Sequence, residues 1–331
     1  MNSSISLKST SPSLSLSLSL SLCDFSEKMA LRSLDNALPI TPDRPKKQAK
    51  VAIPLLKPPS AAAAATVNDE NKAPLPLPPS GDATIDYVSS EDLAPIPDPE
   101  SKIHRLIEGL ESKDWIKVCE WLNNARRFAL YNSDLMLPLL EKVMLVLVKA
   151  MKNPRSALCK TSIMAASDVF KAYGDKLLDA ANSIALDQML LQLLLKALQD
   201  KRFVCEEADR ALSAMVCSLT PLPLLHKLRS YVSHSNLRVR AKAAVSISNC
   251  VSKMGLEQMK EFGLASLLQM AVELLNDRLP EAREAARSIV VWMYECVTEN
   301  QEQKQESWQS FCQISLPPAH VQSMVKIASS Q

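Results

Sequence analysis

The sequence is poor in glycine, in aromatic residues and in long apolar runs, and each shortage excludes a class of protein. Only 5 of the 331 residues are glycine, which leaves little material for phosphate-binding loops or glycine-rich cofactor turns. The aromatic share is 5%, and Leu, Ala, Lys, Glu and Ser dominate, so helices are favoured over a β-sandwich or barrel. The sequence holds no run of about 18 apolar residues, so no membrane span is expected. We expect an all-α protein.

The cysteines and histidines are not spaced for chemistry. The eight cysteines show no paired spacing and fall inside helical patterns, so we expect small buried hydrophobes in a reducing compartment. His104, His226, His234 and His320 lie far apart, and no nucleophile motif of the Gly-x-Ser-x-Gly type occurs. The sequence therefore predicts no enzyme, no cofactor and no metal site.

The first hundred residues differ from the rest of the chain. They hold 14 of the 21 prolines, and they carry 9 basic against 12 acidic residues, while residues 101–331 carry 29 against 24. The overall charge of +2 therefore averages a mildly acidic part and a part with a net charge of +5. We predict a disordered, low-complexity Ser/Pro/Ala-rich tail over residues 1–98 and a folded domain over residues 99–331.

The N-terminus permits two readings of the protein's location. Residues 1–28 are Ser-rich and contain no acid before Asp24, as in a plastid transit peptide. The simpler reading is low-complexity sequence ahead of Met29, a second possible start besides Met1. Since serine alternates with leucine from Ser13 to Leu22, this stretch is too polar for a signal-peptide core. A cytoplasmic protein is expected, with a plastid location as the alternative.

Residues 101–331 repeat one pattern of helix, short polar break and helix. Within residues 135–151, for example, Leu140, Val143, Met144 and Leu147 recur at intervals of three and four, which predicts an amphipathic helix. The breaks centre on Asp114, Asn153, Lys201, Ser235 and Asp277, at separations of 39, 48, 34 and 42 residues. These spacings are typical of HEAT-type units, in which each helical pair buries its apolar stripe against its neighbours. The sequence predicts a HEAT-repeat, armadillo-like α-solenoid of about six helical hairpins.

Basic residues recur at these breaks, which a solenoid aligns along one edge. A row of cations that begins at a tryptophan suits a partner with an extended acidic surface. The alternative is that each base is an ordinary solvated turn residue, and that the tryptophan is a structural anchor for the first helical pair. The row consists of Lys113, Trp115, Arg155, Lys201, Arg202, Arg238 and Arg278.

Three local patterns give the domain a family resemblance. Lys113-Asp114-Trp115 begins the second helix of the first pair, Asn153-Pro154-Arg155-Ser156 begins that of the second, and Lys201-Arg202 forms a basic third turn. Together with the number of units, these resemble TOG domains, above all those of the CLASP and crescerin proteins. The resemblance covers about Pro99 to Gln331 and implies a six-unit HEAT array that binds tubulin through its intra-unit loops.

The resemblance also implies a role for each residue of the row. Trp115, preceded by Lys113, and Arg155 match positions that contact β-tubulin, and Lys201 and Arg202 match the basic third loop. Arg238 and Arg278 match loop bases that tend to reach α-tubulin. TOG proteins usually carry several such domains or a basic linker, whereas this chain shows one domain and an acidic tail. A single microtubule-binding module, of undetermined oligomeric state, is therefore expected.

Two other functions remain open from the sequence. An armadillo-type peptide adaptor would line its groove with repeated Trp and Asn, and Trp121, Asn124 and Asn249 hint at such a ladder. Nucleic-acid binding would require more than a net charge of +5 and more exposed aromatic residues. We expect a cytoplasmic protein of the microtubule cytoskeleton that binds αβ-tubulin, neither nucleic acid nor membrane, with the adaptor as the alternative.

Overall fold

The computed structural model describes residues 87–330, and the expectations for residues 1–86, including the transit peptide, lie outside this range. Every regular element in the described range is a helix. The elements are α2 (Pro99–Ile103), α3 (Leu106–Leu110), α4 (Trp115–Tyr131), α5 (Ser133–Met136), the 3-10 helix η1 (Leu137–Leu139), α6 (Leu140–Met151), α7 (Ser156–Tyr173), the 3-10 helix η2 (Gly174–Leu178), α8 (Ala180–Lys196), α9 (Arg202–Ser218), α10 (Pro221–Arg229), α11 (Leu237–Val251), α12 (Leu256–Phe262), α13 (Leu264–Leu275), α14 (Pro280–Thr298), α15 (Lys304–Ser315) and α16 (Pro318–Ser329).

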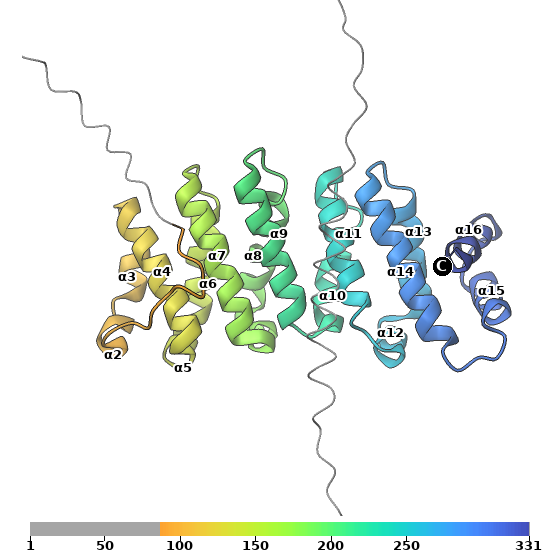
Figure 1. The fold of residues 1–331 in the computed structure, drawn as a ribbon, viewed down its shortest axis with the longest axis horizontal. Helices are drawn as coiled ribbons and strands as arrows, with labels where there is room; N and C mark the ends of the chain where they lie inside the picture. Colours follow the sequence, from red (N-terminus) through yellow and green to blue (C-terminus); the bar gives the residue numbers. More distant parts are fainter. Residues whose placement is uncertain (1–86, 331) are drawn as a thin grey trace, which may run out of the picture. The chain divides into compact units, whose positions relative to one another are not determined.

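Six helical pairs follow one another along the described part of the chain. They are α3/α4, α6/α7, α8/α9, α10/α11, α13/α14 and α15/α16, and Figure 1 shows them side by side in chain order. The helices of each pair pack against each other. The predicted all-α solenoid of about six hairpins is confirmed.

Local sequence signals set many of the helix ends. The Asp114 carboxylate accepts a hydrogen bond of 3.0 Å from the Ile116 N–H and so caps α4, and Asn236 caps α11 in the same way. Proline begins α10, α14 and α16, where its missing N–H has no helical partner to lose. Helices α4, α11 and α16 therefore begin where these local signals place them.

Most other helices begin or end at different residues than their apolar patterns predict, and the pattern over residues 103–110 is divided between α2 and α3. The helix expected over residues 135–151 is divided by η1, because Pro138 lacks the N–H that a continuous helix needs. The helix expected over residues 262–275 begins at Leu264, because Gly263 adopts a left-handed φ of 102° and ends α12. The helix expected from Leu190 begins ten residues earlier, at Ala180.

The second helices form the continuous part of the core. Helix α4 packs against α7, α7 against α9, and α11 against α14. Small residues such as Ala166, Ala208, Ala244 and Ala286 are completely buried in these helices, so neighbouring backbones approach closely. The apolar stripe of each helical pair is covered by the next pair. A single hairpin without such a neighbour would leave this apolar surface exposed to water.

A close approach at the first pair gives Trp121 a structural role. The Trp121 ring lies directly on Gly109 of α3, where a Cβ would stand only 2.2 Å from the ring. Only glycine fits there. Asn124, another residue of the suggested adaptor ladder, accepts a hydrogen bond of 3.0 Å from Arg127. These contacts place both side chains in intramolecular packing instead of a peptide groove.

The segment before α2 is packed onto the helices, although the sequence analysis placed residues 87–98 in the tail. Leu93 is 1% and Ile96 6% exposed. The Tyr131 hydroxyl of α4 donates a hydrogen bond of 2.6 Å to the Leu93 carbonyl. The ordered chain therefore begins at least twelve residues before the predicted boundary.

A buried ion pair between α4 and α7 also holds this segment. Arg126 Nε lies 2.7 Å from Asp168 Oδ2, and the two side chains are 1% and 0% exposed. The same guanidinium donates to the Val88 carbonyl at 2.7 Å and to Ser90 Oγ at 3.1 Å, and Ser90 Oγ donates to Asp168 at 2.7 Å. The network joins two second helices and the incoming segment with every member hydrogen-bonded.

The cysteines of the described range support the expectation of buried apolar side chains in part. Cys119, Cys159, Cys250 and Cys312 are buried, and burial raises the pKa of the Cys250 and Cys312 thiols to about 12. Cys217 is exposed, contrary to the expectation. Within residues 87–330, no helix combines the length and apolarity that a bilayer crossing requires.

Removing the buried cation should destabilise the fold strongly. Arg126→Met leaves the Asp168 carboxylate buried without its counter-ion, so we expect the free energy of unfolding to fall by about 3–5 kcal/mol in urea denaturation. Arg127→Met, which removes only an arginine hydrogen-bonded to Asn124, should cost less than about 1 kcal/mol. If Arg126→Met and Arg127→Met lowered the free energy of unfolding equally, the Arg126–Asp168 network would not be the stabilising contact that we infer.

Candidate functional site

The turns inside five helical pairs lie along one edge of the array, the upper edge in Figure 1. We define the loop edge as these turns together with Trp115, Arg202 and Arg238, which begin or nearly begin the following helices. The turns are residues 111–114, 152–155, 197–201, 230–236 and 276–279.

Contacts between neighbouring turns hold the first three in register. The Arg155 guanidinium lies 5.7 Å from the centre of the Trp115 ring, a cation–π distance. Lys201 Nζ donates a hydrogen bond to Ser156 Oγ at the start of α7. Thus Trp115, Arg155 and Lys201, predicted separately, are brought together along one surface.

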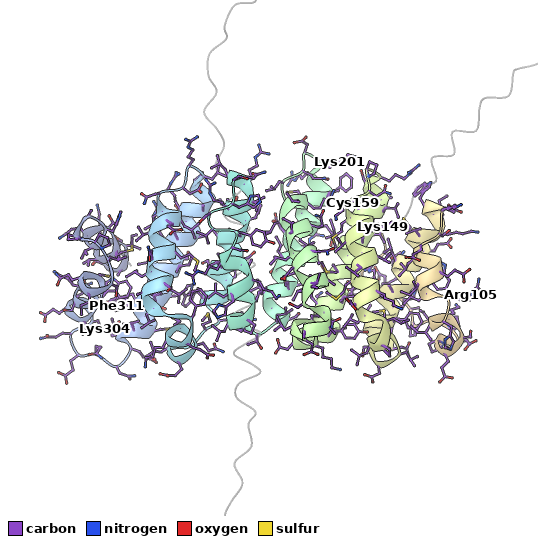
Figure 2. All side chains as sticks on the ribbon, turned by 180° about the vertical axis from the view of Figure 1, so that it is seen from behind. Arg105, Lys149, Cys159, Lys201, Lys304 and Phe311 are labelled. Atoms are coloured by element: carbon purple, nitrogen blue, oxygen red, sulfur yellow. The ribbon has the colours of Figure 1, made fainter. Side chains whose placement is uncertain are left out.

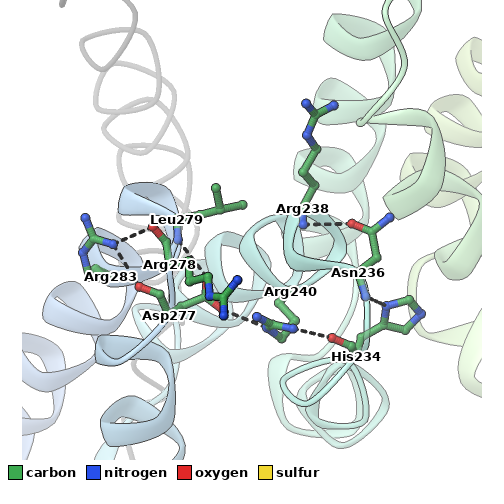
Figure 3. Close-up of polar contacts among 8 residues, drawn as sticks. All are labelled: His234, Asn236, Arg238, Arg240, Asp277, Arg278, Leu279 and Arg283. Carbon is green, nitrogen blue, oxygen red and sulfur yellow. Dashed lines mark hydrogen bonds and ion pairs between the residues drawn. The ribbon is translucent and has the colours of Figure 1, made fainter.

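The fourth and fifth turns are joined by an ion pair, drawn in Figure 3. Arg240 Nε lies 2.7 Å from Asp277 Oδ2, and the same guanidinium donates to the His234 carbonyl at 2.7 Å. Arg283 donates to the carbonyls of Asp277 and Arg278 at 2.9 and 2.8 Å. The side chains of Arg240 and Arg283 therefore support the turns.

Asp277 is the acid on which this junction depends. Burial alone would raise the pKa of its carboxyl group, but the Leu279 N–H and the Arg240 guanidinium hold it below the ordinary value of 3.8. Its other oxygen accepts from the Leu279 N–H at 2.9 Å, so one carboxylate fixes both the fifth turn and its distance from the fourth.

A second bridge lies just inside the edge. Lys242 Nζ of α11 is 3.1 Å from Asp209 of α9 and 3.0 Å from Glu281 of α14. Burial would lower the pKa of Lys242, but the two carboxylates raise it. Three consecutive second helices are tied by one ammonium group, so this lysine stays charged for a structural reason.

The bases predicted for the loop edge take no part in the internal ion pairs of Arg240 and Lys242, and they lie on the surface. Lys113, Arg155, Lys201, Arg202, Arg238 and Arg278 are exposed, while Trp115 is half-buried and packs against the core. Arg202 forms an ion pair with Glu206 at 2.7 Å, but its side chain is 85% exposed, so the pair leaves the guanidinium accessible. Trp115 is therefore packed against the core and still partly exposed at the loop edge.

The exposed charges of the loop edge are mainly positive. The exposed acids are Glu111, Asp114 and Asp200. The exposed bases are Lys113, Lys152, Arg155, Lys201, Arg202, Arg238 and Arg278. The edge therefore attracts an acidic surface over the length of five repeats.

Sequence reasoning missed an aromatic group beside the third turn. Tyr87 and Phe203 are 40% and 39% exposed, with ring centres 6.4 Å apart. Lys160 Nζ lies 4.3 Å from the Tyr87 ring and 5.8 Å from the Phe203 ring. Tyr87 comes from the segment assigned to the tail, so no pattern within the repeats could have placed it here.

No group of three or more His, Cys, Asp or Glu side chains within residues 87–330 is arranged to hold a metal ion. The geometry shows instead a shallow, charged edge built on stacked helical pairs. These features define a helical-repeat protein with a mainly positive edge.

The sequence model of one protein family, described as "CLASP N terminal", matches residues 131–313, which is more than half of the chain. The chain therefore belongs to the CLASP N-terminal family. It is also similar to the mouse "TOG array regulator of axonemal microtubules protein 1", with 29% identity over 212 residues, 63% of this chain and 12% of that protein. The human protein of the same name is 31% identical over 143 residues, 43% of this chain and 8% of that protein. The chain matches about a tenth of the length of these relatives. The TOG resemblance predicted from sequence is confirmed.

Solved structures of low sequence identity were also found. One is the "Crystal Structure of MAST/Orbit N-terminal domain", with a TM-score of 0.48 and 15% identity over 68% of this chain and 95% of that chain. Another is described as "TOG-tubulin binding specificity promotes microtubule dynamics and mitotic spindle formation". Its TM-score is 0.48 and its sequence identity 15%, over 67% of this chain and 80% of that chain.

The lowered pKa of Asp277 gives a pH-dependent prediction. A carboxylate whose folded-state pKa is depressed stabilises the fold above its unfolded-state pKa, near 3.8, and loses this effect as pH falls through the folded-state value. At pH 7, Asp277→Asn should lower the free energy of unfolding by about 1–2 kcal/mol, since Arg240 is partly exposed. In urea denaturation the difference from the unmodified chain should shrink below about pH 4.

The control for this experiment is Asp200→Asn, a change at an exposed turn aspartate. It should change stability by less than about 0.5 kcal/mol at either pH. A cost of Asp277→Asn that stays constant from pH 7 to pH 3 would show that the Asp277 charge does not stabilise the junction.

Proposed function

We propose that this protein is a microtubule-associated protein that binds αβ-tubulin through the loop edge of one TOG-like domain. The family membership and the two relatives named for axonemal microtubules support this class of function. The observation that carries the proposal is the row of exposed bases that begins at Trp115 and continues across five turns.

Electrostatics support an acidic protein as the partner. Most internal cations near the edge, such as Arg240 and Lys242, are satisfied by carboxylates of the domain itself. Among residues 87–330, the exposed bases of the loop edge have no carboxylate within ion-pair distance, apart from the exposed Arg202–Glu206 pair. Complementary charge raises the association rate and orients the partner.

Trp115 supplies the apolar anchor of the proposed interface. A half-buried tryptophan held by the core and by Arg155 loses little conformational freedom on binding, which favours it as a hot spot. By the TOG resemblance, Trp115 and Arg155 contact β-tubulin, and Arg238 and Arg278 match loop bases that tend to reach α-tubulin. Lys113, beside Trp115, and Lys201 and Arg202 of the basic third loop complete the proposed tubulin-binding set.

The peptide-adaptor alternative has less support. Trp121 is covered by the close packing on Gly109, and Asn124 bonds to Arg127, so neither begins an open ladder. We propose residues 87–330 as the binding module, with processive polymerase activity not expected of a single domain. Avidity would then come from oligomerisation or from a partner.

Tubulin binding by the full chain should depend on the loop edge. Lys201→Glu/Arg202→Glu places two negative charges against an acidic partner, and Trp115→Ala removes the anchor, so each variant should weaken co-elution with soluble tubulin or co-sedimentation with microtubules at least about tenfold. Thermal unfolding of each variant checks that the fold is intact.

The matched control reverses the same number of charges at the other edge. Lys142, in the first turn of α6, and Lys176, in η2, are exposed at the helix ends opposite the loop edge, about 25 Å away along an eighteen-residue helix. Lys142→Glu/Lys176→Glu should bind as the unmodified chain does. If binding survives all the loop-edge substitutions, the interface lies on another surface of the domain. If the unmodified chain binds neither soluble tubulin nor microtubules at low salt, the proposed function is wrong.

A further inference from the structure

An open pocket of about 440 Å³ lies between the second and third turns of the loop edge. Three lysines line it from two neighbouring repeats: Lys152 follows α6, Lys196 ends α8, and Lys201 precedes α9. Asp200 is the one acidic residue in the lining. The pocket is therefore a concave site with an excess of positive charge.

Lys196 is the unusual member of this group. The residue is only 9% exposed, and none of the ion pairs found within residues 87–330 involves its ammonium group. The one buried side-chain oxygen or nitrogen without a hydrogen-bond partner in the described range is Ser167 Oγ, so the Lys196 ammonium keeps some contact with solvent, and the residue lines the pocket. An anion entering the pocket would give this ammonium a charge-assisted partner that no acid of the described range supplies.

A buried thiol also lines the pocket. Cys159, in the first turn of α7, lines the same pocket. Burial raises the pKa of the Cys159 thiol, and the positive charges of Lys196 and Lys201 both oppose this rise. The charges of both lysines therefore favour a negative group at this position. Figure 2 shows Lys201 at the loop edge with Cys159 below it.

The rest of the lining suits a carboxylate on a short apolar stem. Pro154 and Leu198 supply apolar surface beside the lysines. A glutamate side chain could pack its methylene groups there while its carboxylate accepts charge-assisted hydrogen bonds from Lys152, Lys196 or Lys201.

We propose that this pocket receives an acidic side chain of the bound protein partner, and that Lys196 is the buried residue that binds its carboxylate. The proposal rests on the proposed function, because Lys201 belongs both to the loop edge and to the pocket. A folded acidic partner lying on the edge would bring its surface side chains over the opening. The pocket then fixes the position of the partner along the row of turns, which exposed cations alone do not do.

The test compares Lys196→Met with Lys142→Met in the full chain. Methionine keeps the length and the apolar stem of Lys196 while removing its charge, and Lys142 is an exposed lysine on α6 outside the pocket. Binding is measured to soluble αβ-tubulin by co-elution and to fluorescein-labelled hexaglutamate by fluorescence anisotropy. Lys196→Met should weaken both about tenfold, and Lys142→Met should change neither. If Lys196→Met unfolds at a lower temperature, Lys152→Met, an exposed change in the same pocket, replaces it.

The outcomes separate this proposal from the proposed function. Tubulin binding that depends on Trp115 but not on Lys196 or Lys152 would overturn the pocket and leave the loop edge intact. Hexaglutamate binding that depends on Lys196 in a chain that does not bind tubulin would refute the proposed function and retain a carboxylate pocket for another acidic protein. Displacement of hexaglutamate by inorganic phosphate far better than by chloride at equal ionic strength would overturn the carboxylate assignment in favour of phosphate.

Discussion

The structure depends on one constraint: a two-helix unit cannot bury its apolar stripe without a neighbour. Helix α7 is covered by α4 on one side and by α9 on the other, and α11 is covered by α14. Because fully buried alanines line these contacts, the second helices lie close together and their N-terminal ends fall in a row. The turns that precede those ends are thereby aligned, and the loop edge follows from core packing.

Polar links between neighbours refine this alignment. Arg126 and Asp168 join α4 to α7, Lys242 joins α9, α11 and α14, and Arg240 with Asp277 joins the fourth turn to the fifth. In each link a basic side chain is paired with a carboxylate of a neighbouring helix or turn, so its charge is neutralised within the domain. The bases left on the edge are those with no comparable internal role, and this division between structural and exposed cations gives the proposed interface its sign.

The fold could be predicted from the sequence because its signals are local. Three local signals identify helices without reference to distant residues. They are apolar residues at intervals of three and four, Asp114 as a cap, and proline as the first residue of α14 and α16. The start of α8 was missed because polar Asn182 and Ser183 interrupt its apolar pattern. The buried Asn182 is satisfied by the Lys176 carbonyl, at 2.9 Å, and no sequence pattern announces that bond.

The features of the core and of the loop edge that could not be predicted depend on packing between residues far apart in the sequence. Arg126 and Asp168 lie 42 residues apart, and only the docking of α4 on α7 makes them a pair. Leu93 and Ile96 are single apolar residues in a proline-rich segment without periodicity, so their burial could not be inferred. The same holds for Lys196, whose position beside the second turn follows from the packing of α8 against α6 and is invisible in the basic pattern of the third turn.

The central claim is that the aligned turns form the surface that binds tubulin. Amide hydrogen exchange of the full chain, with and without saturating αβ-tubulin, tests it most directly because it locates the contact without a substitution. The account predicts slower exchange in residues 111–116, 152–156 and 197–203, and unchanged exchange in α5, η2 and α12 at the opposite edge. Protection confined to α5, η2 and α12, with none in the turns, would contradict it.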